Sequence, residues 1–546
     1  MDDRLPPLRA PRLVDGSSPD CVQALRGVSS GRGRIAGTRG GVGGGGRRCS
    51  LGDDGRIGGV LLSTAWECRS GVGAYSRRVG GGSGVVAAPL RQLFRVASPH
   101  DRLGSLPVRS ARGRGRSGGE AVTVVPAVIL GGGLAGLQLR RLLHERGVET
   151  VVLESREMTG GLCRTISKGD WSWDVGPHAF YSRDPAIMSE YRALPIEYRA
   201  HARRVRVHHR GRAVNYPFEN GLADLPFGDR WECVSGYLRA SMFGERPFRN
   251  LHHWIEHGLG DGIARHFMLP YNRKIWSVPL QEISMGLVKN KIEPEPPWKI
   301  VRNALIPGTV GRGYQSRFIY PRTNGAGAIP DAVAKASGGE IATGVPVRSL
   351  EKTERGWRVC CERGRRLEAE RVVSTIPIPS LIDALPPGPW KASRDRFKFN
   401  DTIFVAVGLK EGRRFRRFGD CHWVFFAGPE SFYRLTFMNA LDPARLDTVV
   451  AEITVKGEEA DAQGRVIRDL LAAGILGSED DIGLVAAHRE HCTYPIQTLD
   501  LDRDRAALER ELEPLGVFLL GRSGRWDYVN TDGIFARVRA FAEAFA

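Results

Sequence analysis

The feature that most constrains the fold of this chain is a βαβ unit at residues 124–164. Its opening run, VVPAVIL, is almost entirely apolar, as expected of a buried parallel strand. The run ends in a G-x-G-x-x-G turn, Gly131–Gly136, and apolar residues then recur at helical spacing until Gly147. A second strand at 149–153 delivers Glu154. This order predicts a dinucleotide site, in which a pyrophosphate meets the helix N-terminus and the acidic residue accepts a ribose hydroxyl.

The glycine pattern alone has little value, because residues 41–46 match it without a preceding strand or a following helix. At Gly131 the context is present on both sides. Directly after the acidic residue, the segment GGLCR at 160–164 adds a second close backbone approach and a guanidinium, as FAD enzymes of the amine-oxidase type have. FAD is therefore the predicted cofactor.

Residues 1–120 differ in composition from the rest of the chain. They hold 26 of the 68 glycines and have 20 Arg, no Lys and 9 acidic residues, a net charge of +11 out of +18 for the 546 residues. Without a sustained apolar period, such a segment cannot bury enough surface to offset chain entropy, so we expect a disordered Arg/Gly-rich extension. A nucleic-acid tail, a transit peptide and translation from a start placed too far upstream all remain open, although the aromatic residues are not interleaved with the arginines.

The cysteine pattern and the hydropathy of the sequence indicate in which compartment the protein is expected. The nine cysteines form no C-x-x-C pair and no zinc spacing, which suits a reducing cytoplasm. No run of 18 apolar residues and no signal-peptide core is present, so the sequence predicts neither a membrane span nor secretion by that route. We expect a cytoplasmic protein with no metal and no nucleic-acid partner. The oligomeric state is left open.

The rest of the chain predicts an α/β fold with α+β insertions: a Rossmann-like FAD-binding domain interleaved with a helical and β-sheet substrate domain. Alternating residues from Trp171 lead into a Gly-Pro turn that presents His178. The expected division is an extension at 1–120, FAD-binding parts at 121–182, 320–380 and 501–546, a mostly helical substrate domain at 183–319, and a β-rich substrate-side domain at 381–500.

Seven motifs in order carry a family resemblance that covers the chain from about Val124 to its end. They are DVGPH at 174–178, YPFE at 216–219, PYNRKIW at 270–276, WVFF at 423–426, FYR at 432–434, YP at 494–495 and GRSGRWDY at 521–528. Together they resemble the UDP-galactopyranose mutases, within the wider amine-oxidase and protoporphyrinogen-oxidase flavoprotein superfamily. In that family, N5 of the reduced flavin attacks the anomeric carbon of the sugar. Catalysis is therefore covalent and carried by the cofactor.

The resemblance implies a set of site residues and a small-molecule substrate, a nucleotide sugar, together with an external reductant or electron acceptor. The expected catalytic residues are His178 at the flavin face and the two cations Arg434 and Lys291 at the diphosphate. The expected cofactor-binding residues are Gly131, Gly133, Leu134, Ala135, Gly136, Glu154, Ser155, Gly160, Gly161, Leu162, Arg164, His178, Val347, Gly521, Arg522 and Asp532. The expected substrate-binding residues are Tyr216, Asn272, Trp276, Lys291, Trp423, Phe425, Arg434, Tyr494 and Tyr528.

Three positions depart from the mutase pattern. The mutases have arginine where Lys291 stands, and a point charge does not replace a bidentate fork. They have glutamine and tyrosine where this chain has Glu219 and Phe425, and a carboxylate is a poor fit beside an anionic nucleotide. Two other hypotheses therefore remain: a net FAD-dependent oxidoreductase of the amine-oxidase or protoporphyrinogen-oxidase type, and a non-catalytic Arg/Gly binding protein.

Overall fold

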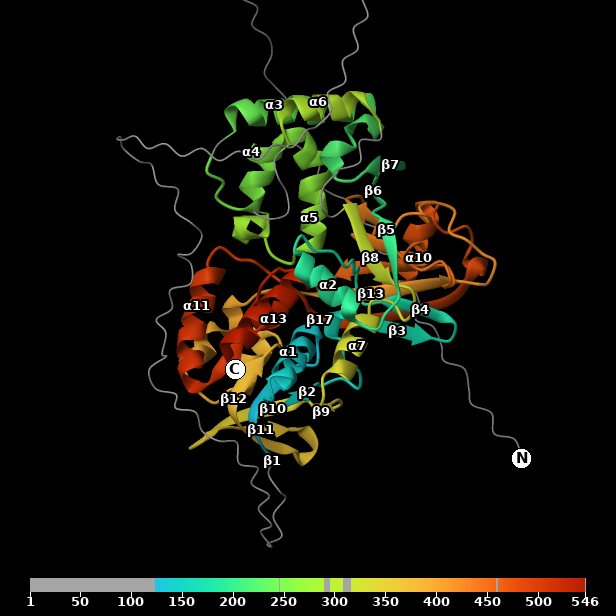
Figure 1. Ribbon diagram of the computed structural model, residues 1–546. Helices are drawn as coiled ribbons and strands as arrows, with labels where there is room; N and C mark the ends of the chain where they lie inside the picture. Colours follow the sequence, from blue (N-terminus) through green and yellow to red (C-terminus); the bar gives the residue numbers. More distant parts are fainter. Residues whose placement is uncertain (1–122, 245, 289–294, 308–315, 458–459, 546) are drawn as a thin grey trace, which may run out of the picture. The chain divides into compact units, whose positions relative to one another are not determined.

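The computed structural model describes residues 123–244, 246–288, 295–307, 316–457 and 460–545 (Figure 1). The predicted extension at 1–120 and the predicted site residue Lys291 lie outside these ranges. Within them the chain forms two large mixed or antiparallel sheets with helices packed around them, and the predicted α/β fold class is confirmed.

The first sheet contains the glycine turn and has the order β10-β11-β12-β1-β2-β9, with β18 paired to β12. Strands β9, β2, β1, β12 and β18 are parallel, whereas β10 and β11 form an antiparallel extension. The central strands β1 and β2 are largely apolar and buried, as expected of strands covered on both faces, whereas β9 and β12 also carry exposed charged residues. The strands are β1 (Thr123–Leu130), β2 (Thr150–Leu153), β9 (Glu340–Ala342), β10 (Val347–Thr353), β11 (Gly356–Cys361), β12 (Arg366–Ser374) and β18 (Val517–Leu519).

Helix α1 (Leu134–Glu145) runs from the glycine turn and packs against two helices from distant parts of the sequence, α7 (Ala328–Ala336) and α13 (Thr531–Phe545). Its apolar face, with Leu139 and Leu143 fully buried, holds it against the sheet. The remaining helices associated with this part are α8 (Ile378–Ala384), α11 (Leu501–Leu512) and α12 (Gly521–Gly524).

The second sheet has the order β17-β13-β16-β15-β14-β6-β7 and is antiparallel except for the pair β14 and β6. Its central strands are buried on both faces, as the continuous apolar run of β13 indicates. The strands are β6 (Val205–His209), β7 (Arg212–Asn215), β13 (Phe399–Leu409), β14 (Trp423–Phe426), β15 (Arg434–Phe437), β16 (Thr448–Thr454) and β17 (Ile482–Pro495), with α9 (Met438–Leu441) and α10 (Ala462–Ala472) beside them.

Two ribbons of two strands and a group of helices complete the described chain. The ribbons pair β3 (Thr165–Lys168) with β4 (Trp171–Asp174) and β5 (Tyr198–Ala202) with β8 (Arg317–Pro321). The helices are α2 (Pro185–Ala193), α3 (Phe227–Phe243), α4 (Leu251–Ile263), α5 (Leu269–Ile275) and α6 (Pro297–Leu305).

The segment 183–319, expected to be mostly helical, therefore contains three strands before its main helices. The histidine- and arginine-rich stretch 198–215 forms β5, β6 and β7, because its alternating residues place one face in the core. In the described ranges, no helix is both long enough and apolar enough to cross a bilayer.

Candidate functional site

A cavity of about 1480 Å³ extends from the glycine turn of the first sheet to the strands of the second. Pockets for a single small ligand usually have about 300–1,000 Å³. The cavity is therefore large enough for an extended dinucleotide together with a second ligand. It joins the predicted cofactor residues to the predicted substrate residues in one space.

The glycine turn presents bare backbone to this cavity. Gly131 has a φ of +100°, and a Cβ there would lie 2.6 Å from Thr375 Oγ1, so a side chain is excluded. At Gly133, by contrast, a Cβ would meet only the Gly161 Cα, at 3.8 Å, and would otherwise extend into the cavity. The first turn of α1 has no side-chain cap, so its N–H groups face the space where a pyrophosphate is expected.

Glu154 is buried and held in a fixed orientation at the end of β2. Its Oε2 accepts the Gly132 N–H at 2.8 Å, and its Oε1 accepts the Arg156 N–H at 2.9 Å. Both oxygens retain acceptor capacity, since a carboxylate has about four lone-pair directions. Glu154 and its neighbour Ser155 line the cavity, as a contact with a ribose requires.

Twelve of the predicted cofactor residues line the cavity. They are Gly131, Gly133, Leu134, Ala135, Glu154, Ser155, Gly160, Gly161, Leu162, His178, Val347 and Arg522.

Four other predicted cofactor residues do not line it. Arg164 is buried and pairs with Glu490, while its Nη1 donates to the Gly161 carbonyl at 2.6 Å. A buried guanidinium needs a carboxylate partner, so Arg164 holds the 160–164 loop instead of facing the ligand. Gly136 and Gly521 are packing positions, because a Cβ would lie 2.1 Å from the Gly131 carbonyl oxygen in the first case and 2.7 Å from the Ala135 Cβ in the second. Asp532 lies in the first turn of α13, whose neighbouring residues Thr531 and Ile534 line the cavity instead.

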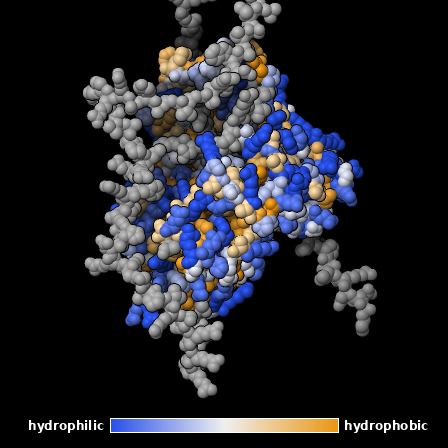
Figure 2. All heavy atoms as spheres, in the orientation of Figure 1, coloured by the Kyte–Doolittle hydropathy of each residue, from blue (hydrophilic) through white to orange (hydrophobic). Residues whose placement is uncertain are grey.

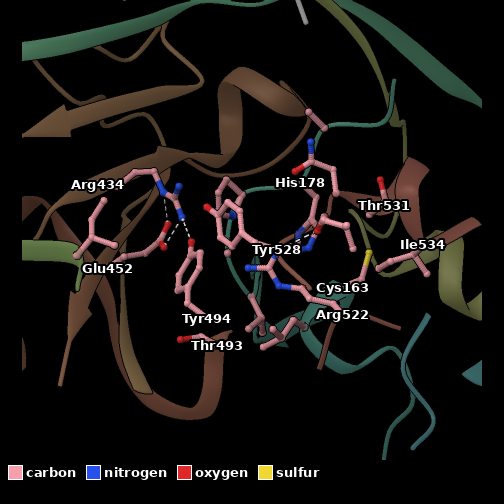
Figure 3. Close-up of a pocket in the computed structure, with 18 of the residues that line it drawn as sticks. Cys163, His178, Arg434, Glu452, Thr493, Tyr494, Arg522, Tyr528, Thr531 and Ile534 are labelled. Atoms are coloured by element: carbon pink, nitrogen blue, oxygen red, sulfur yellow. Dashed lines mark hydrogen bonds and ion pairs between the residues drawn. The ribbon is translucent and has the colours of Figure 1, made fainter. Parts of the chain in front are cut away.

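His178 lies after β4 on a turn in which Gly176 has a φ of +82°. The Nδ1 of His178 is buried and has no hydrogen-bond partner among the described residues. Burial lowers the pKa of His178, with the negative charge of Asp174 opposing this effect, so the neutral imidazole is favoured. A neutral ring with an unpaired nitrogen offers a donor or acceptor to a bound ligand (Figure 3).

Arg522 occupies the middle of the cavity, between the cofactor and substrate ends. Its Nη1 donates to the Val529 carbonyl at 2.9 Å, and its guanidinium lies over the rings of Tyr528 and Tyr494, at 4.7 and 5.3 Å from their centroids. Its Nε is buried without a partner among the described residues. The open backbone at Gly133 and the unpaired nitrogens of His178 and Arg522 fit a polar ligand such as FAD.

All eight of the predicted substrate residues that the structure describes line the same cavity: Tyr216, Asn272, Trp276, Trp423, Phe425, Arg434, Tyr494 and Tyr528. Several of them form aromatic contacts, with Tyr216 4.9 Å from Phe425 and Trp276 6.1 Å from Tyr494 between ring centroids. Asn272 is engaged within the protein. Its Nδ2 donates to the Met268 carbonyl and its Oδ1 accepts the Trp276 indole N–H, so it orients that ring.

Arg434 forms a buried ion pair that the sequence did not indicate. Its Nε and Nη2 donate to the two carboxylate oxygens of Glu452 at 2.7 and 2.5 Å, and Nη2 also donates to the Tyr494 hydroxyl at 2.9 Å (Figure 3). Glu452 is 1% exposed and also accepts the Tyr433 hydroxyl. Among the described residues, no partner bonds to Arg434 Nη1, so one edge of the guanidinium remains available to a ligand.

Two further residues were not singled out from the sequence. Glu452 occupies the otherwise apolar strand β16, and that isolated charge is the signal that could have found it. Arg203 lies in the cavity lining with its guanidinium 5.5 Å from the ring centroids of both Tyr216 and Trp423. No spacing in the sequence distinguishes it from the neighbouring Arg204.

Glu219, one of the departures from the mutase pattern, lines the cavity beside Glu295 and Lys299. Burial, reinforced by the negative charge of Glu295, raises the pKa of Glu219 to about 7, with Lys299 opposing. The carboxyl group is therefore largely neutral in mildly acidic solution. This reduces the conflict with an anionic ligand that its sequence position suggests.

Comparison with known proteins places these features in a family. The chain matches the family model for flavin containing amine oxidoreductase over residues 134–411. Flavin-containing amine oxidase B of Cavia porcellus is 32% identical over 110 residues, 20% of each chain. The chain spans from one fifth to three fifths of the length of the curated relatives that it matches.

Solved structures share the fold. Reduced UDP-galactopyranose mutase superposes with a TM-score of 0.72 at 24% identity, covering 77% of this chain and 94% of that one. Putrescine oxidase bound to putrescine superposes with a TM-score of 0.54 at 16% identity, covering 78% and 99%. The family model spans more than half of the chain, from the start of α1 to just past β13, so this protein belongs to the flavin-containing amine oxidoreductase family and its cofactor is FAD.

Proposed function

We propose that this FAD-dependent protein is a mutase-like enzyme that interconverts the pyranose and furanose forms of a nucleotide sugar. The observation that carries the proposal is the charge of the cavity lining, in which basic residues outnumber acidic ones by eight to four. Such a lining attracts a diphosphate and repels a protonated amine. The basic residues are Arg156, Arg183, Arg203, Arg204, Arg206, Lys299, Arg434 and Arg522, and the acidic ones are Glu154, Glu219, Glu295 and Glu452.

The substrate end supports the same assignment. In the proposal, Arg434 contacts the diphosphate through Nη1 while Glu452 and Tyr494 fix the orientation of its guanidinium. The arginine and aromatic stack of Arg203, Tyr216 and Trp423 offers flat surfaces to a base or sugar ring. The Lys291 contact with the diphosphate stays a prediction.

When bound and reduced, FAD would supply the nucleophilic nitrogen for this reaction. The chain contributes orientation and charge. His178 presents a neutral ring nitrogen near the cofactor end, and the rings of Tyr494, Tyr528 and Trp276 exclude water between the two ends. An isomerisation involves no net electron transfer and cannot itself reduce the flavin, so an external reductant would have to supply the electrons beforehand.

The second candidate is a net oxidoreductase of the amine-oxidase or protoporphyrinogen-oxidase type. The family match favours it directly, because the family model describes amine oxidoreductases. The large aromatic share of the lining, including Trp254, Phe267 and Phe404, would also suit an apolar substrate in oxidised enzyme.

A pair of assays on the purified, FAD-loaded protein distinguishes these functions. Under anaerobic conditions, dithionite-reduced enzyme is incubated with UDP-galactofuranose, and the two UDP-sugars are separated by chromatography. We expect interconversion by reduced enzyme and none by oxidised enzyme. Hydrogen peroxide formation from an amine panel by oxidised enzyme, without sugar interconversion in the reduced state, would refute the mutase proposal and support the oxidoreductase.

A further inference from the structure

An exposed apolar surface covers the outer faces of α3 and α6, at the top of Figure 1. Of the eleven large hydrophobic side chains that are strongly exposed in the described chain, eight lie on these two helices or directly after α6. Orange atoms are visible at this end in Figure 2. This end surface consists of Phe227, Trp231, Met242, Phe243, Trp298, Val301, Leu305 and Ile306, with exposures from 36% for Val301 to 79% for Phe227.

The pattern on each helix shows that the exposure is built into the sequence. On α6, Ile300 and Ala304 are buried, whereas Trp298, Val301 and Leu305, spaced by three and four residues, form a continuous exposed stripe. On α3, which packs against α4 and α6, Tyr237 is buried, whereas Phe227, Trp231 and Phe243 are exposed. A monomer in water normally hides stripes of this size, so the end surface indicates a binding site.

The charges around the end surface are predominantly positive. Among the described residues of 227–268 and 297–307, five arginines and two carboxylates are exposed. The arginines are Arg239, Arg246, Arg249, Arg265 and Arg302, and the carboxylates are Glu232 and Asp261, which pair with Arg265 and Arg239 and leave a net charge of three positive among these seven residues. A surface that combines tryptophan, phenylalanine and leucine with surrounding arginines complements the boundary between the acyl chains and the negative headgroups of an anionic bilayer.

We propose that the end surface docks this protein onto an anionic membrane surface, with α3 and α6 lying in the headgroup layer. Side chains as exposed as Phe227 and Phe243 protrude from the protein and enter a fluid bilayer without needing a matching pocket. The two tryptophans, Trp231 and Trp298, suit the interfacial region, where an apolar ring meets a polar N–H. Helix α6 also contributes Lys299 to the cavity lining, so docking brings the cavity to within one helix of the lipid.

The test measures sedimentation of the full-length, FAD-loaded protein with vesicles of phosphatidylcholine and phosphatidylglycerol. Replacing both Trp231→Ser and Trp298→Ser removes two large apolar contacts. We expect at least about a tenfold loss of partitioning, because burying even one large apolar side chain accounts for an order of magnitude in affinity. The control is Leu499→Ser, which removes a 54% exposed leucine outside the end surface and should partition like the wild type.

The full chain retains residues 1–120, whose arginines could attract anionic vesicles independently. If that attraction caused the binding, the double variant would sediment like the wild type, and the proposal would be wrong. Binding to pure phosphatidylcholine as strong as to the mixed vesicles would also contradict it. A change of oligomeric state in the double variant, with vesicle binding unaltered, would identify the end surface as a protein interface instead. FAD content and circular dichroism establish that each variant is folded.

Discussion

Removing Arg434 should lower the free energy of unfolding, because it breaks the buried ion pair with Glu452 in the substrate half of the cavity. In Arg434→Ala, the Glu452 carboxylate loses both guanidinium hydrogen bonds and keeps only the Tyr433 hydroxyl at 2.8 Å. With Arg434 in place the carboxylate is 1% exposed, and the variant leaves it at the wall of the cavity without its cation. Breaking a buried pair from one side typically destabilises a protein by about 3–5 kcal/mol.

A second variant tests whether the loss of stability comes from the unpaired charge of Glu452 or from lost packing contacts. Arg434→Met combined with Glu452→Leu removes both charges and leaves apolar groups of comparable volume. Only the hydroxyls of Tyr433 and Tyr494 then lack a partner, and each such group costs roughly 1–3 kcal/mol. The double variant should therefore be more stable than Arg434→Ala, since no uncompensated charge remains.

Urea unfolding, followed by circular dichroism and flavin fluorescence, measures both stabilities, and a UDP titration of each folded variant measures binding. Both variants should lose about ten- to a hundredfold in UDP affinity if Arg434 contacts the diphosphate, as a charge-assisted bond of roughly 1.5–3 kcal/mol implies. Arg489→Ala is the matched control, because Arg489 pairs with Asp401 on the same sheet but is 59% exposed. The Arg489→Ala substitution should lower the free energy of unfolding by under about 1 kcal/mol.

Two results would refute this reasoning. If Arg434→Ala were no more destabilised than the control, the pair with Glu452 would be screened by solvent. If the double variant bound UDP as tightly as the wild type, Arg434 would make no diphosphate contact, and its proposed role in substrate binding would be wrong.

Two further predictions concern the cavity and one concerns residues 1–120. Gly133→Val should lower FAD occupancy after purification, since its side chain would fill the space beside Gly161, and an unchanged flavin spectrum would contradict this. Affinity for UDP should fall as the pH rises through about 7, where Glu219 ionises, and Glu219→Gln should remove that dependence. The pKa of Glu219 is raised in the folded state, so its contribution to the free energy of unfolding is present below its ordinary pKa and is lost as the pH rises through about 7. If Glu219→Gln had the same pH profiles of UDP affinity and stability as the wild type, both effects would be excluded. A chain starting near Ala121 should keep its FAD and melting temperature, because residues 1–120 have no core-forming pattern; a loss of several degrees would show that they pack on the rest.

The elements around the cofactor were predictable because their signals are local. The strand, glycine turn, helix and acidic residue follow within about thirty positions, and β1, α1 and β2 lie where the spacing placed them. The strands at 198–215 were missed, since a short segment rich in histidine and arginine has no clear local preference. Strand β6 pairs with β14, which is far away in the sequence, and β7 is joined to the sheet through β6.

Local sequence patterns do not show which carboxylate pairs with a given buried arginine. Arg164 and Arg434 were both expected to face ligands, because an arginine beside a predicted site has no visible partner in the sequence. In the structure Glu490 and Glu452 compensate them, and the second pair follows from register: β15 and β16 are adjacent antiparallel strands in which Arg434 lies opposite Glu452. A single carboxylate within the apolar run TVVAEIT has to be paired in a core, and the nearest preceding strand carries a single arginine. A search for isolated charges in apolar strands, made before assigning cations to a ligand, would therefore have predicted the Arg434–Glu452 pair.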